Sequence, residues 1–141
     1  MNYDLDIKVE IQKDWFSVVQ ATQNPNKLYV FGDNMQRIGR GGQAMIRGVP
    51  NAMGIATKCS PAMTNNAFFS DKPEQGKVIL QDINAIVQVL QDKSRGFDTL
   101  VLPGNGLGTG LSQMPTRSPQ LFDWMNATIS IIFGVDYDPN W

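Results

Sequence analysis

Two glycine-rich stretches carry the residue types that could do chemistry in this sequence. Residues 27–44 read KLYVFGDNMQRIGRGGQA, in which a strand-like run ends in Gly-Asp-Asn and a Gly-Gly pair follows. Residues 103–111 read PGNGLGTGL, with a glycine at every second position. Glycine lets successive backbone amides approach a ligand without a Cβ, so either stretch could hold a phosphate group.

Neither stretch has the spacing of a common nucleotide-binding motif. The dinucleotide fingerprint GxGxxG and the phosphate loop GxxxxGK[ST] are both missing. The chain has no histidine and a single cysteine, Cys59, which excludes a Ser-His or Cys-His pair, an intrachain disulfide and the usual zinc ligand sets. Chemistry would therefore rest on carboxylates, lysine or the ligand itself, and we expect no metal and no cofactor.

Composition and charge limit the class of protein. A length of 141 residues, 42% of them hydrophobic and 18% charged, suits one globular domain, and no linker or repeat divides residues 1–141. A net charge of −1 gives no basic field for a nucleic-acid backbone, so any nucleotide bound here is expected to be small. No apolar run suits a membrane span, and the first residues lack the pattern of a signal peptide. We expect a cytoplasmic protein that binds neither a nucleic-acid backbone nor a membrane.

The segments that must position the glycines alternate between strands and helices. Apolar periodicity predicts strands over 5–12, 27–32, 51–58 and 97–103, and helices over 13–24, 41–48, 77–93 and 118–133. This alternation predicts an α/β fold with a mainly parallel sheet. Ligands of such folds bind beyond the carboxyl ends of the strands, where both glycine stretches are expected.

The sequence also predicts how the longer helices begin, which of their faces are buried, and a long connection before 77–93. Ser118 is the expected N-cap of the last helix, with Pro119 at N1. The connection over 59–76 is long enough to be a candidate binding lid. The expected buried faces of the two longer helices are Ile79, Ile83, Ile86 and Leu90 in one, and Leu121, Met125, Ile129 and Ile132 in the other.

The order of these segments resembles that of macro domains. YVFGDN is similar to their opening strand with Gly-Asp, GRGGQAMIRG to their first phosphate loop, and LVLPGNGLGTGL to their second. With GIATKCSP as a strand ending in Thr-Lys, the sequence most resembles the terminal ADP-ribose protein glycohydrolases and the DNA ADP-ribosyl glycohydrolase antitoxins. The resemblance covers residues 28–133. It implies a three-layer α/β/α fold around a central mixed, mainly parallel sheet, shortened because only seven residues separate Asp33 from Gly41.

The resemblance also implies roles for individual residues. Asp33, with Asn34 beside it, would accept a hydrogen bond from the adenine amino group, and Lys58 would attack the anomeric carbon. Asn105 would lie near the ribose. The loop residues that would face the distal ribose and the diphosphate are Gly41, Gly42 and Gln43 from the first stretch, and Gly106, Leu107, Gly108, Thr109 and Gly110 from the second.

The function implied is binding of ADP-ribose or a related NAD-derived nucleotide, with an ADP-ribosylated macromolecule as the target if Lys58 is catalytic. Gly110 stands where this subfamily has its acid, and Asp71 is the nearby carboxylate that could replace it. Binding without hydrolysis is therefore the more economical prediction. Arg37, Arg40 and Arg47 surround the first glycine stretch and could pair with phosphates or lie in solvent.

Three alternatives stay open. PGNGLGT partly matches the PGGxGT signature of Rossmann-like nucleotide hydrolases that cleave N-glycosidic bonds, but Ser112 and Gln113 stand where those enzymes have a glutamate. A viral or antitoxin-type protein that sequesters a nucleotide signal would also need a small nucleotide pocket. A non-catalytic interaction domain would use the glycines only as turns.

Overall fold

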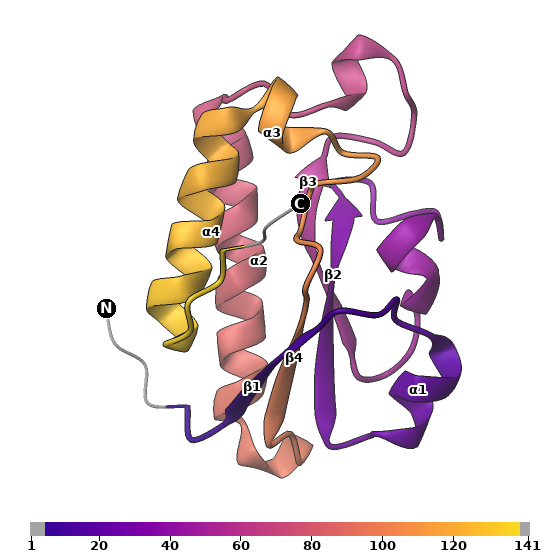
Figure 1. Cartoon of the computed structure of the whole chain (residues 1–141), viewed down its shortest axis with the longest axis vertical. Coiled ribbons are helices and arrows are strands. Elements are labelled where there is room, and N and C mark those ends of the chain that lie inside the picture. The colour runs from indigo at the N-terminus through magenta and orange to yellow at the C-terminus, as the bar shows by residue number, and fades with distance from the viewer. Residues whose placement is uncertain (1–4, 139–141) are drawn as a thin grey trace.

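A sheet of four parallel strands forms the centre of the protein (Figure 1). The structure is a computed structural model and describes residues 5–138. The strands pair in the order β1-β4-β2-β3. Their bounds are β1 (Lys8–Gln12), β2 (Lys27–Asn34), β3 (Ala52–Lys58) and β4 (Thr99–Pro103). The helices are α1 (Val18–Gln23), α2 (Pro73–Gln91), α3 (Met114–Arg117) and α4 (Pro119–Phe133), with 3₁₀ turns η1 (Gly42–Ile46), η2 (Asn65–Ala67) and η3 (Lys93–Arg95).

Helices cover both faces of the sheet, which confirms the predicted α/β class. In Figure 1, α2 and α4 lie on one side of the strands, and α1 and the segment before β3 lie on the other. Every pairing between described strands is parallel, and no strand lies between β2 and η1 in residues 5–138, so the sheet is short as expected. Residues 1–4 and 139–141 of the predicted single domain lie outside the described residues.

The continuous apolar runs of β2 and β4 are explained by burial on both faces. Leu28 and Val30 of β2 pack toward α2 and α4, whereas the alternate residues Tyr29 and Phe31 belong to a second core on the α1 side. Val101 of β4 joins that second core. Since neighbouring residues of a strand point to opposite faces, a strand between two layers must be apolar throughout.

Helix α2 buries the face that its periodicity predicts, with Ile79, Ile83, Ile86 and Leu90 inside. It begins at Pro73, however, and not at residue 77. Gln75 makes this earlier start possible, because its side-chain Oε1 accepts hydrogen bonds from the amides of Ser70 (2.8 Å) and Lys72 (3.1 Å). The long connection is therefore shorter than expected.

The start of α4 differs from the prediction in its capping group. Ser118 occupies the N-cap position, but its side chain makes no capping hydrogen bond. The carboxylate of Asp71 accepts instead from the amides of Leu121 (2.9 Å) and Gln120 (3.4 Å). A carboxylate suits a helix N-terminus, whose amides lack partners and carry partial positive charge. Asp71 therefore holds the connection before α2 against α4.

That connection is packed down on the protein. Phe68 and Phe69 are buried, and the Cys59 amide donates to the Ala67 carbonyl at 2.8 Å. The short helix predicted over 41–48 is the 3₁₀ helix η1, which spans Gly42–Ile46. Across residues 5–138, no helix combines the length and the apolar character needed to cross a membrane.

Tyr137 connects the segment after α4 to the end of β4. Its hydroxyl donates to the Pro103 carbonyl at 2.6 Å, directly before the second glycine stretch. Burial raises the pKa of the Tyr137 phenol above its usual value near 10.0. The folded state thus keeps the phenol protonated at pH values where the unfolded chain would lose the proton.

We expect Tyr137→Phe to lower the free energy of unfolding by about 1 kcal/mol at neutral pH, the typical worth of one hydrogen bond. The contribution of the raised pKa is complete below pH 10 and is lost as the pH rises above it, because the unfolded phenol then ionises first. Urea denaturation at pH 7 and above pH 10 measures both effects. A difference between wild type and variant that stays constant across this range would contradict the second expectation.

Candidate functional site

The two glycine stretches meet in one pocket of about 270 Å³ at the carboxyl ends of β2, β3 and β4. Residues 41–43 line it from the first stretch, and Asn105 and residues 108–112 from the second. Gly32 of β2, Thr57 of β3 and Trp15 from the β1–α1 connection complete the lining among the described residues. The pocket thus lies where ligands of parallel α/β sheets bind.

Most of the backbone amides in the two glycine stretches at the pocket have no hydrogen-bond acceptor in the described part of the protein. Within residues 5–138, none of the amides of 107–112 donates a hydrogen bond, and neither do those of 41–43. The amides that flank the longer run are paired, since Gly106 donates to the Pro103 carbonyl and Gln113 to the Gly110 carbonyl, both at 3.1 Å. Because backbone N–H groups are rarely left without a partner, these amides need water or a ligand rich in acceptor oxygens.

Gly108 fixes the tight turn in the second stretch. Its φ is +79°, a region that side chains rarely adopt, and a Cβ there would overlap the Sδ atom of Met114. The Met114 amide donates to the Gly108 carbonyl at 2.8 Å. The loop is therefore pressed against the start of α3 and cannot open there without losing buried contacts.

Gln43 joins the two stretches through its side-chain amide. Its Oε1 accepts from the Gly32 amide at 2.9 Å, and its Nε2 donates to the Gly106 carbonyl at 2.7 Å and to Asn105 Oδ1 at 3.2 Å. The sequence placed Gln43 among the ligand-binding residues. In the structure, the polar atoms of Gln43 instead hold the loops together. The side-chain NH₂ group of Asn105 makes no hydrogen bond within the described residues and can donate to another acceptor.

A hydroxyl pair closes the pocket beside β3. Thr57 Oγ1 donates to the Asp33 carbonyl at 3.0 Å and lies 2.7 Å from Ser112 Oγ. Thr57 has a single proton, so Ser112 must be the donor in the second contact. Ser112 therefore presents only lone pairs to the pocket and can accept a hydrogen bond from a ligand.

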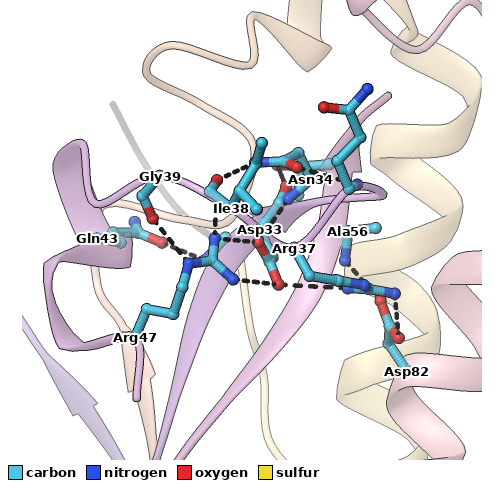
Figure 2. A network of polar contacts seen from close by, with 12 residues as sticks. Asp33, Asn34, Arg37, Ile38, Gly39, Gln43, Arg47, Ala56 and Asp82 are labelled. Atoms are coloured by element: carbon cyan, nitrogen blue, oxygen red, sulfur yellow. Dashed lines mark hydrogen bonds and ion pairs between the residues drawn. The ribbon is translucent and has the colours of Figure 1, made fainter. Parts of the chain in front are cut away.

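Asp33 lies outside the pocket lining, in a network with two arginines (Figure 2). Its carboxylate is paired with Arg47 through both oxygens, one of them in a short contact with Nη2, and Oδ2 lies 3.4 Å from Arg37 Nη1. The Asp33 side chain is only 5% exposed. Gly54 makes room for it, because a Cβ at Gly54 would lie 2.7 Å from the carboxylate. The adenine role implied for Asp33 would require it to leave these partners.

The same network ties the end of β2 to α2. Arg37 Nη2 donates to Asp82 Oδ1 at 2.7 Å, and Asp82 Oδ2 accepts from the Ala56 amide at 2.7 Å. Burial opposes the charge on Arg37, but the hydrogen bonds and charges of Asp82 and Asp33 outweigh it and raise the pKa of Arg37. Two of the three arginines near the first stretch thus pair with carboxylates of the protein.

Asn34 is also used within the protein. Its Nδ2 donates to the Ile38 carbonyl at 2.8 Å, and its Oδ1 accepts from the Gln36 amide at 3.0 Å. These bonds shape the turn after β2, a common role of asparagine at a strand end. Asn34, like Asp33, does not line the pocket.

Lys58 is buried at the end of β3 and is not part of the pocket lining. Its Nζ donates to the Ala62 carbonyl at 2.7 Å and lies 4.6 Å from the centre of the Phe68 ring. Burial, together with the nearby charge of Arg117, lowers the pKa of Lys58. No carboxylate among residues 5–138 forms an ion pair with it, so it lacks an acid or base partner for group transfer.

The structure therefore brings together some predicted site residues and separates others. Gly41, Gly42, Gln43, Asn105, Gly108, Thr109 and Gly110 line one pocket, whereas Asp33, Asn34, Lys58, Gly106 and Leu107 lie outside its lining. Sequence reasoning missed Trp15, Gly32, Thr57, Leu111 and Ser112 as lining residues. Strand alternation places Thr57 and Lys58 on opposite sides of β3, but only the structure shows that the pocket lies on the side of Thr57. No group of three or more cysteine or acidic side chains in the described part of the chain could hold a metal ion.

Comparison with known protein families adds one finding. Residues 11–128 match DUF7831, a family of unknown function. The chain belongs to this family. The DUF7831 match runs from β1 into α4 and so includes both glycine stretches and the Asp33–Arg47 pair. Searches of curated proteins and of solved structures found no match.

The buried ion pair of this DUF7831 protein gives a stability prediction. We expect Asp33→Asn to lower the free energy of unfolding by about 3 kcal/mol, because it leaves the charge of Arg47, whose side chain is only 16% exposed, without its partner. Arg47→Met should cost a similar amount, and the double variant should cost less than the sum. Urea denaturation of the four proteins measures this coupling. Additive losses would show that the pair does not act as a unit.

Proposed function

We propose that the protein binds ADP-ribose or a related NAD-derived nucleotide, with the diphosphate held by amides of the two glycine stretches. The observation that carries the proposal is the run of unpaired amides over 108–112, which shares one pocket with those of 41–43. Successive amides around a concavity form an anion site without any charged side chain. The order of motifs that resembles macro domains supports the same ligand.

Two polar side chains in the pocket suit the sugar of such a ligand. Ser112 Oγ can accept a hydrogen bond from a ribose hydroxyl, because its own proton is already donated to Thr57. The Asn105 NH₂ group can donate to a ribose or phosphate oxygen. The Thr109 hydroxyl cannot donate to the ligand, because it already donates to the Asn105 carbonyl at 2.8 Å. A macromolecule that carries ADP-ribose would present the same groups.

Binding without hydrolysis is the form of the proposal that the geometry supports best. Lys58 lies outside the pocket lining, and Asp71, the candidate replacement acid, caps α4. The lining among the described residues contains no carboxylate, lysine or arginine. Among the described residues, the lining therefore offers neither the lysine nucleophile nor a carboxylic acid for proton transfer.

The first test is calorimetric titration with ADP-ribose, with AMP and NAD as comparison ligands. We expect micromolar affinity for ADP-ribose and much weaker binding of AMP, which has no diphosphate for the amides to hold. The purified protein in one buffer serves for all three titrations. The absence of heat with every ligand would contradict the proposal.

Gly110 offers a sharper test of the diphosphate position. A Cβ at Gly110 would meet no atom within 4 Å, and its φ is not positive, so a side chain can be added without strain. We expect Gly110→Asp to weaken ADP-ribose binding at least about tenfold more than Gly110→Asn, about 1.4 kcal/mol, because only Asp repels the diphosphate. The two side chains have nearly the same shape. Equal affinities would place the diphosphate elsewhere.

Lys58→Ala separates binding from hydrolysis. Since Lys58 lies outside the lining, we expect the dissociation constant for ADP-ribose to change less than about tenfold, or 1.4 kcal/mol. Calorimetry of the variant measures this, and its melting temperature controls for loss of the folded protein. A larger loss of affinity in a folded variant would bring Lys58 into the binding site. Any glycohydrolase activity of the wild type should disappear in the variant if Lys58 is the nucleophile.

A further inference from the structure

We infer that Trp15 stacks on the base of the bound nucleotide, an inference that rests on the proposed function. Trp15 lines the pocket but is 63% exposed, and its neighbour in the lining, Leu111, is 59% exposed. Two large apolar side chains this exposed at the same pocket form an apolar surface that a ligand could cover. Together they form an apolar rim on a pocket whose wall is otherwise rich in amides.

The backbone around Trp15 is held in place although its indole is exposed. Phe16 is 3% exposed and packs edge to face against Tyr29, with ring centres 5.3 Å apart. On the other side, Gln12 Nε2 donates to the carbonyls of Asp14 (3.0 Å) and Trp15 (3.3 Å). The indole is therefore presented to the pocket from an anchored segment, which lowers the entropy that stacking on a ligand would cost.

Leu111 is positioned from the other glycine stretch. A Cβ at Gly41 would lie 3.5 Å from Leu111 Cδ1, so this side chain rests against the first stretch while it belongs to the second. The rim thus includes parts of the β1–α1 connection and the loop after β4. A planar apolar group covering Trp15 and Leu111 would lie beside the unpaired amides.

The unpaired amides and the exposed indole together indicate which class of ligand the pocket would bind. Unpaired amides favour an anionic group with several oxygens, and an exposed indole favours a flat aromatic ring, so one ligand with both parts satisfies the whole pocket. The other candidates for holding a base are engaged elsewhere, because Asp33 is paired with Arg47, and Phe68 and Phe69 are buried. The base would therefore be held by stacking on Trp15.

The test compares ADP-ribose with inorganic diphosphate, which has no base, on the chain of residues 1–141. We expect Trp15→Ala to weaken ADP-ribose binding about 10- to 100-fold and to leave diphosphate binding unchanged, because stacking contributes only to the ligand that has a ring. Trp15→Phe should keep most of the affinity. Trp124→Ala is the matched control, since Trp124 is 39% exposed and lies outside the pocket lining.

The outcomes separate this inference from the proposed function. Wild-type binding of ADP-ribose that Trp15→Ala leaves unchanged would overturn the stacking role and leave the proposed function standing. An equal loss for ADP-ribose and diphosphate would also overturn it, because Trp15 would then act on the loops and not on the base. A wild-type protein that binds neither ligand would overturn both.

Discussion

The side-chain amide of Gln43 is the contact on which the pocket depends. The two glycine stretches are far apart in the chain, and the contact of Gln43 with Gly32 on one side and Gly106 and Asn105 on the other fixes their separation. A glutamine can do this because it offers an acceptor and two donors on one rigid group. Because its polar atoms are occupied, the polar groups left for a ligand are the unpaired backbone amides together with Asn105 and Ser112.

A second polar group has a structural role where its sequence context suggests a binding role. Asp33 is the second-last residue of β2 and part of a Gly-Asp pair, yet its carboxylate pairs with Arg47. It also contacts Arg37, which in turn forms an ion pair with Asp82 on α2. Such a buried ion pair contributes little net stability but is costly to break, and so it fixes one arrangement of the turn after β2. The turn then delivers Gly41 and Gly42 to the pocket.

Periodicity predicted the larger elements, because the apolar face of α2 and the two-sided burial of β2 and β4 are properties of local sequence. Element ends were less predictable: Gln75 starts α2 early, and Asp71 caps α4 from a distant loop. The glycines of the pocket could be predicted, since they follow strands that end at one edge. The partner of Asp33 and the exposure of Trp15 could not, because both depend on which segments meet after folding.

The strand order has a consequence for synthesis on the ribosome. Strand β1 pairs with β4 alone among the described strands, and β4 lies between it and β2. Strands β2 and β3 can pair as soon as residue 58 has emerged, but β1 must wait as an unpaired edge until β4 is made. Pairing over such long sequence separations is slow and leaves strand edges exposed during folding. The pocket, whose second wall follows β4, is therefore among the last parts of the protein to form.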